Sequence, residues 1–368
     1  MIRHRRRYRL ERAALVASLA VLGSCEGGDP GTAPIVSDRG AEPLTCSISN
    51  SEIFNGGPGK DGIPALTNPP MVFPGSDEAS YLRDDDRVIG LVVEGEPIAV
   101  PLNILWWHEI VNIDMGGRRL AVTHCPLTGS SLAFDREPLG GIELGVSGLL
   151  YRNNLIMYDR SGDESLWPQM LRGAACGSKL GTDLAEFPIM EATWQGWRVL
   201  FPGTRVVGSN TGSGANYQAY PYGDYARLDN AEVLFPMGPI DRRRPPKERV
   251  LGIPQGAGGG RAYPFGAMAS RGEVVVVDEG THVVFWSQVA QAAMAYRPLS
   301  DGARLTFQVL DGEITDLETG STWNASGIAS AGPLAGRRLE PVAEAYVAYW
   351  FAWAAFHETT TLWPEPGS

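Results

Sequence analysis

The chain has 368 residues, of which 43% are hydrophobic and 20% charged, enough for one large or two ordinary globular domains with a sizeable core. Its formal net charge is −11. Residues 1–24 contain six Arg and one Glu, a net charge of +5, so the rest of the chain carries −16. Such an acidic domain repels phosphate backbones, which excludes nucleic acid as an expected partner.

The N-terminal residues are typical of a bacterial export signal. Residues 2–12 are basic, residues 13–22 are apolar but too short to span a bilayer, and small residues precede Cys25. This order resembles a lipobox, in which the signal 1–24 is removed and Cys25 is lipidated; an ordinary signal peptide cut nearby is the alternative. We expect an exported protein, lipid-anchored to the bacterial cell envelope, that meets the membrane through Cys25.

Changes in composition divide the chain into segments. Gly, Pro and Asp dominate residues 26–40, which is typical of a flexible tether, and turn-forming residues dominate the stretch that follows. The predicted segments are a signal peptide (1–24), a lipid-anchor tether (25–48), a loop-rich N-terminal extension (49–86), a first repeat (87–206), a linker or insertion (207–247) and a second repeat (248–363).

Matched segments indicate that one unit occurs twice. RVIGLVVEGEPIAVPL (87–102) matches RVLGIPQGAGGGRAYPF (249–265), and AVTHCPLTGSSLAFD (121–135) matches VVFWSQVAQAAMAYR (283–297), both at an offset of 162. Later matches align Trp167 with Trp323, Trp194 with Trp350 and Trp197 with Trp353. Matches in the same order predict an internal duplication.

Hydrophobic periodicity predicts mostly strands in each unit. Residues 87–102 alternate around a Gly-containing turn and predict a hairpin, residues 102–112 predict a short helix, and residues 190–203 predict a closing helix. Four further strands are expected at 118–125, 130–136, 142–151 and 153–160. The expected fold is α+β and strand-rich, with two pseudo-equivalent tandem repeats, each holding several strands and short helices.

Several long stretches resemble one bacterial family. KDGIPALTNP, AVTHCPLTGSSLAFDR, LGVSGLLYRNNLIMYDRSGDESLWPQ and GPLAGRRLEP are similar to the family of unknown function DUF3179, and the resemblance runs from about residue 50 to residue 363. It implies no particular activity. Members commonly carry Tyr-Cys-Pro-Leu-Cys where this chain has HCPLT, so Thr128 stands at the second cysteine position and weakens any site built on a Cys-x-x-Cys pair.

Three cysteines follow the lipidation site and allow three single pairings. Cys46 and Cys176 lie outside the cysteine motif of the family, which makes a Cys46–Cys176 disulfide the economical pairing in an exported protein. It would leave Cys125 free; two further free thiols are the alternative.

The segment around Cys125 is the main candidate for chemistry. A thiol near an imidazole can act as a nucleophile or a metal ligand. His124 is adjacent, but neighbouring residues of a strand face opposite ways, so His108 is the better partner unless the strand ends at Pro126. The second repeat has Ser287, Trp286 and a position near Arg271 at these places, so packing does not require a thiol or imidazole there.

Three interpretations of this segment stay open. Cys125 and His108 form a catalytic pair, or they bind copper or zinc together with His124, because sulfur and nitrogen ligands favour soft or borderline metals. Cys125 is a buried small hydrophobe and His108 is satisfied by a carbonyl group. Cys125 forms a disulfide.

Asp159 and Arg160 are further candidates, either as a structural ion pair or, with His124, as part of a polar pocket beside the Cys125 loop. Two functions compete. One is an anchored extracytoplasmic protein with a Cys/His metal-binding or redox site in the first repeat. The other is a non-catalytic binding or structural module that presents the cleft between the repeats to a small molecule or a protein.

Overall fold

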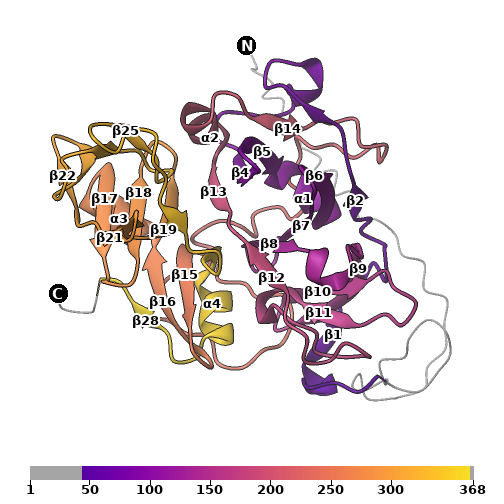
Figure 1. The fold of residues 1–368 in the computed structure, drawn as a ribbon. Helices are drawn as coiled ribbons and strands as arrows, with labels where there is room; N and C mark the ends of the chain where they lie inside the picture. The colour runs from indigo at the N-terminus through magenta and orange to yellow at the C-terminus, as the bar shows by residue number, and fades with distance from the viewer. Residues whose placement is uncertain (1–43, 365–368) are drawn as a thin grey trace, which may run out of the picture. The chain divides into compact units, whose positions relative to one another are not determined.

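Strands dominate residues 44–364, the part of the chain that the computed structural model describes (Figure 1). The predicted signal 1–24, Cys25 and most of the tether lie outside the described residues. Within the described range there are four α-helices of seven residues each: α1 (Leu102–His108), α2 (Trp194–Leu200), α3 (Phe265–Arg271) and α4 (Trp350–Phe356). None of these helices is long and apolar enough to cross a membrane. The strand-rich α+β class is confirmed.

The strands before residue 208 lie mainly in three sheets. One has the order β1 (Ile53–Asn55), β9 (Leu144–Tyr151), β10 (Asn154–Asp159) and β11 (Leu166–Pro168). Another has the order β13 (Met190–Thr193), β4 (Arg87–Val93), β5 (Glu96–Pro101), β14 (Arg205–Val207) and β3 (Met71–Val72). The third begins with β2 (Leu66–Thr67), β6 (Ile110–Met115), β7 (Arg118–Cys125) and β8 (Ser130–Asp135), and β12 (Ala185–Phe187) also pairs with β8.

The third sheet joins the two halves of the chain. It continues from β8 through β27 (Tyr346–Tyr349), β15 (Arg249–Gln255), β16 (Gly259–Pro264) and β28 (Thr361–Leu362). Later strands form smaller sheets: β17 (Val274–Asp278), β18 (Val283–Ser287), β19 (Ala292–Arg297) and β26 (Glu340–Pro341); β20 (Leu299–Ser300) and β21 (Ala303–Arg304); β22 (Phe307–Leu310), β23 (Glu313–Asp316), β24 (Thr322–Trp323) and β25 (Ala329–Ala331).

The predicted elements of the first half are present, with two corrected boundaries. The hairpin at 87–102 forms β4 and β5, and the strand predicted at 118–125 is β7. The helix predicted to reach residue 112 ends at His108, because Glu109 has a φ of 55° and β6 begins directly after it. The helix predicted from residue 190 begins at Trp194, where the side chain of Thr193 caps it by accepting a hydrogen bond from the Gly196 amide.

The same local packing occurs once in each half. Gly90 in β4 lies under the ring of Trp197, where an added Cβ would meet the ring at 2.3 Å, and Gly252 in β15 lies under Trp353 with a corresponding distance of 2.2 Å. Each of these indoles donates to a threonine seven residues later, over 2.8 Å in both halves. A larger residue at either glycine would displace a buried tryptophan.

The two halves also exchange equivalent backbone hydrogen bonds. The amide of Thr193 donates to the carbonyl of Ala290 over 2.9 Å, and the amide of Tyr349 donates to the carbonyl of Thr128 over 2.8 Å. In addition Ser131 of β8 pairs with Val347 of β27. Strands β13 and β27 therefore each lie against the turn at the end of a hairpin in the opposite half.

Candidate functional site

Cys125 ends β7 and is fully buried. Its Sγ accepts a hydrogen bond from the Leu155 amide at 3.4 Å and lies 3.6 Å from the carbonyl oxygen of Asn153. Burial raises the pKa of the thiol to about 11, with a further contribution from Glu109. Cys125 is therefore a protonated, packed thiol at neutral pH.

The loop after Cys125 is fixed by a buried polar network. Thr128 and Ser130 exchange a hydrogen bond of 2.8 Å, and the amide of Asn154 donates to both hydroxyl groups. Ser130 also donates to Gln169 over 2.5 Å. Gly129 has a φ of 58°, and a Cβ there would lie 2.6 Å from the ring of Tyr349. At the second cysteine position of the motif, Thr128 is thus a structural hydroxyl.

His108 is held away from this loop by partners of its own. Its Nδ1 lies 2.7 Å from the carbonyl oxygen of Pro64, and its Nε2 lies 2.7 Å from the hydroxyl of Tyr217. Residues 44–364 contain no group of three or more His, Cys, Asp or Glu placed to hold a metal ion. Both ring nitrogens of His108 therefore already have partners, and the copper or zinc site at Cys125, His108 and His124 stays a prediction.

Asp159 and Arg160 each form ion pairs with other residues. Asp159 is buried and accepts hydrogen bonds from the Trp167 indole at 2.9 Å and from Lys179 at 3.1 Å. The second half repeats this indole contact between Trp323 and Asp316, which indicates a structural role.

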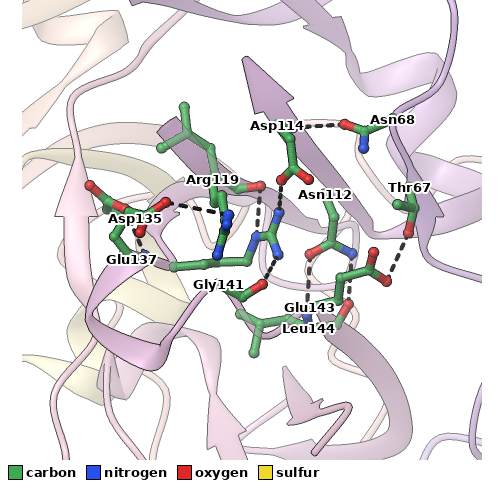
Figure 2. Close-up of polar contacts among 12 residues, drawn as sticks. Thr67, Asn68, Asn112, Asp114, Arg119, Asp135, Glu137, Gly141, Glu143 and Leu144 are labelled. Atoms are coloured by element: carbon green, nitrogen blue, oxygen red, sulfur yellow. Dashed lines mark hydrogen bonds and ion pairs between the residues drawn. The ribbon is translucent and has the colours of Figure 1, made fainter. Parts of the chain in front are cut away.

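Arg160 forms ion pairs with two other carboxylates. It donates to Glu143 over 2.9 Å and to Asp61 over 3.4 Å. Figure 2 shows Glu143 also accepting a hydrogen bond from the Thr67 hydroxyl. Beside it, the side chain of Asn112 donates to the backbone oxygen of Leu144. These acidic groups are therefore neutralised by partners of their own.

His124 belongs to a different chain of contacts. Its Nδ1 lies 3.1 Å from the Ser131 hydroxyl, which donates to Oε2 of Glu191 over 2.7 Å. Burial lowers the pKa of His124 to about 4, so the imidazole is neutral at pH 7. Glu191, on β13, is 1% exposed and joins this chain to two arginines.

Arg87 and Arg249 share one oxygen of Glu191. The Nε of Arg87 donates to Oε1 over 2.5 Å and the Nε of Arg249 donates to the same atom over 3.2 Å. Burial alone would raise the pKa of Glu191, but the two guanidinium groups outweigh it and lower that pKa to about 2. The two arginines are the first residues of β4 and β15, so the two halves contribute one each.

Several guanidinium nitrogens remain without hydrogen-bond partners among the described residues. They are both Nη atoms of Arg249 and Nη1 of Arg87; the Nη2 atom of Arg87 donates to the backbone oxygens of Glu191 and Gln291 over 3.1 Å each. The Arg249 side chain is 27% exposed, so these donors reach solvent.

Two adjoining hollows meet at Arg249. The larger, of about 320 Å³, is lined by Arg87, Lys247, Arg249, Trp286, Gln288 and Gln291, among others. The smaller, of about 110 Å³, is lined by Leu102, Trp106, His124, Pro126, Tyr220, Ala226, Arg249 and Tyr349. Ala226 and Arg249 line both. We call the two hollows together the arginine cleft.

The arginine cleft carries a surplus of positive charge. Glu191 balances one of the two arginines, and Glu248 is already paired with Arg244 at 2.6 Å. Lys247 is 2% exposed, donates to the backbone oxygen of Glu232 and lies 3.4 Å from the centre of the Tyr225 ring. Burial lowers the pKa of Lys247 to about 8, so the ammonium is still mostly charged at pH 7.

Comparison with known proteins places the chain in a family. The model of DUF3179, described as a protein of unknown function, matches residues 60–360. The chain belongs to the DUF3179 family. No curated protein and no solved structure matches it.

The residues that gather in this DUF3179 chain differ from those predicted. Of the predicted set, His124 reaches the arginine cleft, whereas Cys125, His108, Asp159 and Arg160 have separate structural partners. The residues predicted from the sequence did not include Arg87, Arg249 or Glu191. A signal for the arginines existed: the matched segments RVIG and RVLG both begin with arginine, and a charged residue at the same place in two matched segments is a candidate for a shared role.

Proposed function

We propose that this DUF3179 protein is an exported, lipid-anchored binding module that holds a small anionic molecule in the arginine cleft. The observation that carries the proposal is the pair Arg87 and Arg249, which is fixed by one buried carboxylate and still has free donors facing a hollow.

The two guanidinium groups are held in place before a ligand binds. Glu191 holds both Nε atoms, so the guanidinium groups lose little freedom when a ligand arrives. A guanidinium presents its remaining N–H groups as a planar fork that matches a carboxylate or a phosphate. An anion in the cleft would also offset the charge of the one arginine that Glu191 does not balance.

An internal duplication explains why the arginines meet. The ordered sequence matches, the paired glycine and tryptophan contacts and the reciprocal backbone hydrogen bonds support two copies of one unit. Because Arg87 and Arg249 occupy matching positions, such a pairing brings equivalent side chains together at the junction of the copies. The site would then belong to neither copy alone.

Export and anchoring at Cys25 rest on the sequence of residues 1–25. A tethered binding module outside the cytoplasm would meet dissolved anions of the envelope without diffusing away.

A thiol and imidazole centre, with Cys125 and His108 as catalytic or redox residues, has weaker support. Each of these side chains already has buried partners, and the pKa of the thiol is raised. Such a centre would need a rearrangement of α1 or of the Cys125 loop.

Calorimetric titration of the full chain in detergent with acetate, inorganic phosphate and sulfate tests the proposal. We expect saturable binding of at least one anion that weakens about 10- to 100-fold in Arg249→Gln, because a charge-assisted hydrogen bond contributes about 1.5–3 kcal/mol. The matched control is Arg227→Gln, since the Arg227 side chain is exposed and pairs with Asp229. Absence of binding, or equal weakening in both variants, would contradict the proposal.

A further inference from the structure

The smaller hollow of the arginine cleft is an apolar chamber with one charged wall. Its lining includes Leu102, Trp106, Pro126 and Ala226, the largely apolar rings of Tyr220 and Tyr349 with their polar hydroxyls, and the polar side chains of His124 and Arg249. Leu102 is buried, and the Trp106 and Tyr220 rings pack edge to face with centroids 4.8 Å apart. Such walls favour hydrocarbon over water.

The imidazole in this chamber does not add a charge. His124 is 3% exposed and its Nδ1 is taken up by the Ser131 hydroxyl. Burial, which lowers the pKa of His124, keeps it neutral at physiological pH. A second anionic group would therefore find no counter-charge beyond Arg249, which limits the inner end of a ligand to uncharged groups.

The position of Arg249 fixes the order of groups along a ligand. Arg249 lines both hollows, and the Tyr349 ring lies 5.6 Å from its guanidinium carbon. An acid bound by the free Nη atoms would thus have the apolar chamber directly beside it. The charged and apolar parts of the ligand must be neighbours in its structure.

The small volume of this hollow favours a small apolar group. The chamber holds about 110 Å³. An engineered apolar cavity of about 150 Å³ holds a benzene ring, so a smaller group is expected here. A branched chain of three to five carbons fits this limit better than an aromatic ring.

From these four features we infer that the ligand is a short branched-chain carboxylate, with its acid group at Arg249 and Arg87 and its alkyl group in the chamber of Trp106, Tyr220 and Tyr349. The inference rests on the proposed anion-binding function and adds the chemical class of the ligand.

A series of simple ligands tests the class on the unmodified full chain. Titrations use acetate, isovalerate, isoamyl alcohol and phenylacetate. Each buried methylene strengthens binding about fourfold, so isovalerate should bind on the order of 50-fold tighter than acetate. Isoamyl alcohol has the same alkyl group without the acid and should bind far more weakly than isovalerate, and phenylacetate should bind more weakly as well.

A change in chamber size gives a second readout. Trp106→Ala enlarges the chamber, so phenylacetate should gain at least tenfold relative to isovalerate. The matched control is Trp107→Ala, because Trp107 is the next residue and does not line the chamber. Equal effects of the two variants on the phenylacetate to isovalerate ratio would overturn the assignment of the chamber.

The outcomes separate the two proposals. If no anion binds, or if binding is insensitive to Arg249→Gln, the anion-binding function itself fails. If acetate binds in an Arg249-dependent way but isovalerate binds no tighter, the function stands and the branched-chain class is overturned.

Discussion

Glu191 is a buried carboxylate that stabilises the structure through its hydrogen bonds and ion pairs. It is 1% exposed and binds the Nε atoms of two arginines and the hydroxyl of Ser131. Replacing one member of such a buried set leaves charges without compensation and costs about 3–5 kcal/mol. The same contacts make Glu191 the residue on which the geometry of the arginine cleft depends.

We therefore predict that Glu191→Gln lowers the free energy of unfolding by about 3–5 kcal/mol at pH 7. Folding depresses the pKa of Glu191 from its ordinary value of 4.5 to about 2, so its stabilisation is present above pH 4.5 and is lost as the pH falls toward 2. The gap between wild type and variant in urea unfolding should shrink over that window.

The exposed Glu94, which pairs with Arg118 on the surface, offers the control. Glu94→Gln should change stability little at any pH. A gap for Glu191→Gln that stays constant from pH 7 to pH 3 would argue against the assigned ion pairs.

At the scale of elements, the disulfide Cys46–Cys176 attaches the N-terminal segment to the first half. The two cysteines are 130 residues apart, as predicted, and Cys46 also forms a bridge pairing with Cys176 in the backbone. The bond closes a long loop that contains β1 to β11, so its effect on the entropy of the unfolded chain is large.

We predict that replacing both cysteines by serine lowers the free energy of unfolding by about 3–5 kcal/mol on the chain-entropy model. Denaturant unfolding with and without a reductant measures this. The reductant should destabilise the wild type and leave the double variant unchanged. A wild type that is insensitive to the reductant under denaturing conditions would contradict the prediction.

For the whole molecule, the proposed anchoring at Cys25 would determine where the arginine cleft works. The predicted lipidation of Cys25 implies that Cys25→Ser abolishes incorporation of a labelled fatty acid and moves the protein from the membrane to the soluble envelope fraction. Gly23→Ala, a change between small residues, is the matched control and should leave the label in place. Labelling that persists in Cys25→Ser would rule out this anchor.

The sequence by itself predicted the strand-rich class, the β4–β5 hairpin, strand β7 and the Cys46–Cys176 pairing, with the family resemblance contributing to the last. These features follow from local alternation, turn residues and a small number of cysteines. Helix ends were harder to predict from the sequence. Helix α1 ends because Glu109 has a positive φ, and glutamate is not a residue type that indicates this conformation.

Only the tertiary structure decided which polar residues meet. Cys125 and His124 are neighbours in sequence, yet one packs against Asn153 and the other reaches Ser131 on the opposite face. Arg87 and Arg249 are 162 positions apart and converge on Glu191, because β4 and β15 start at the junction of the two halves. Periodicity reports which face of an element is buried, whereas the packing of distant strands determines which side chains share a cleft.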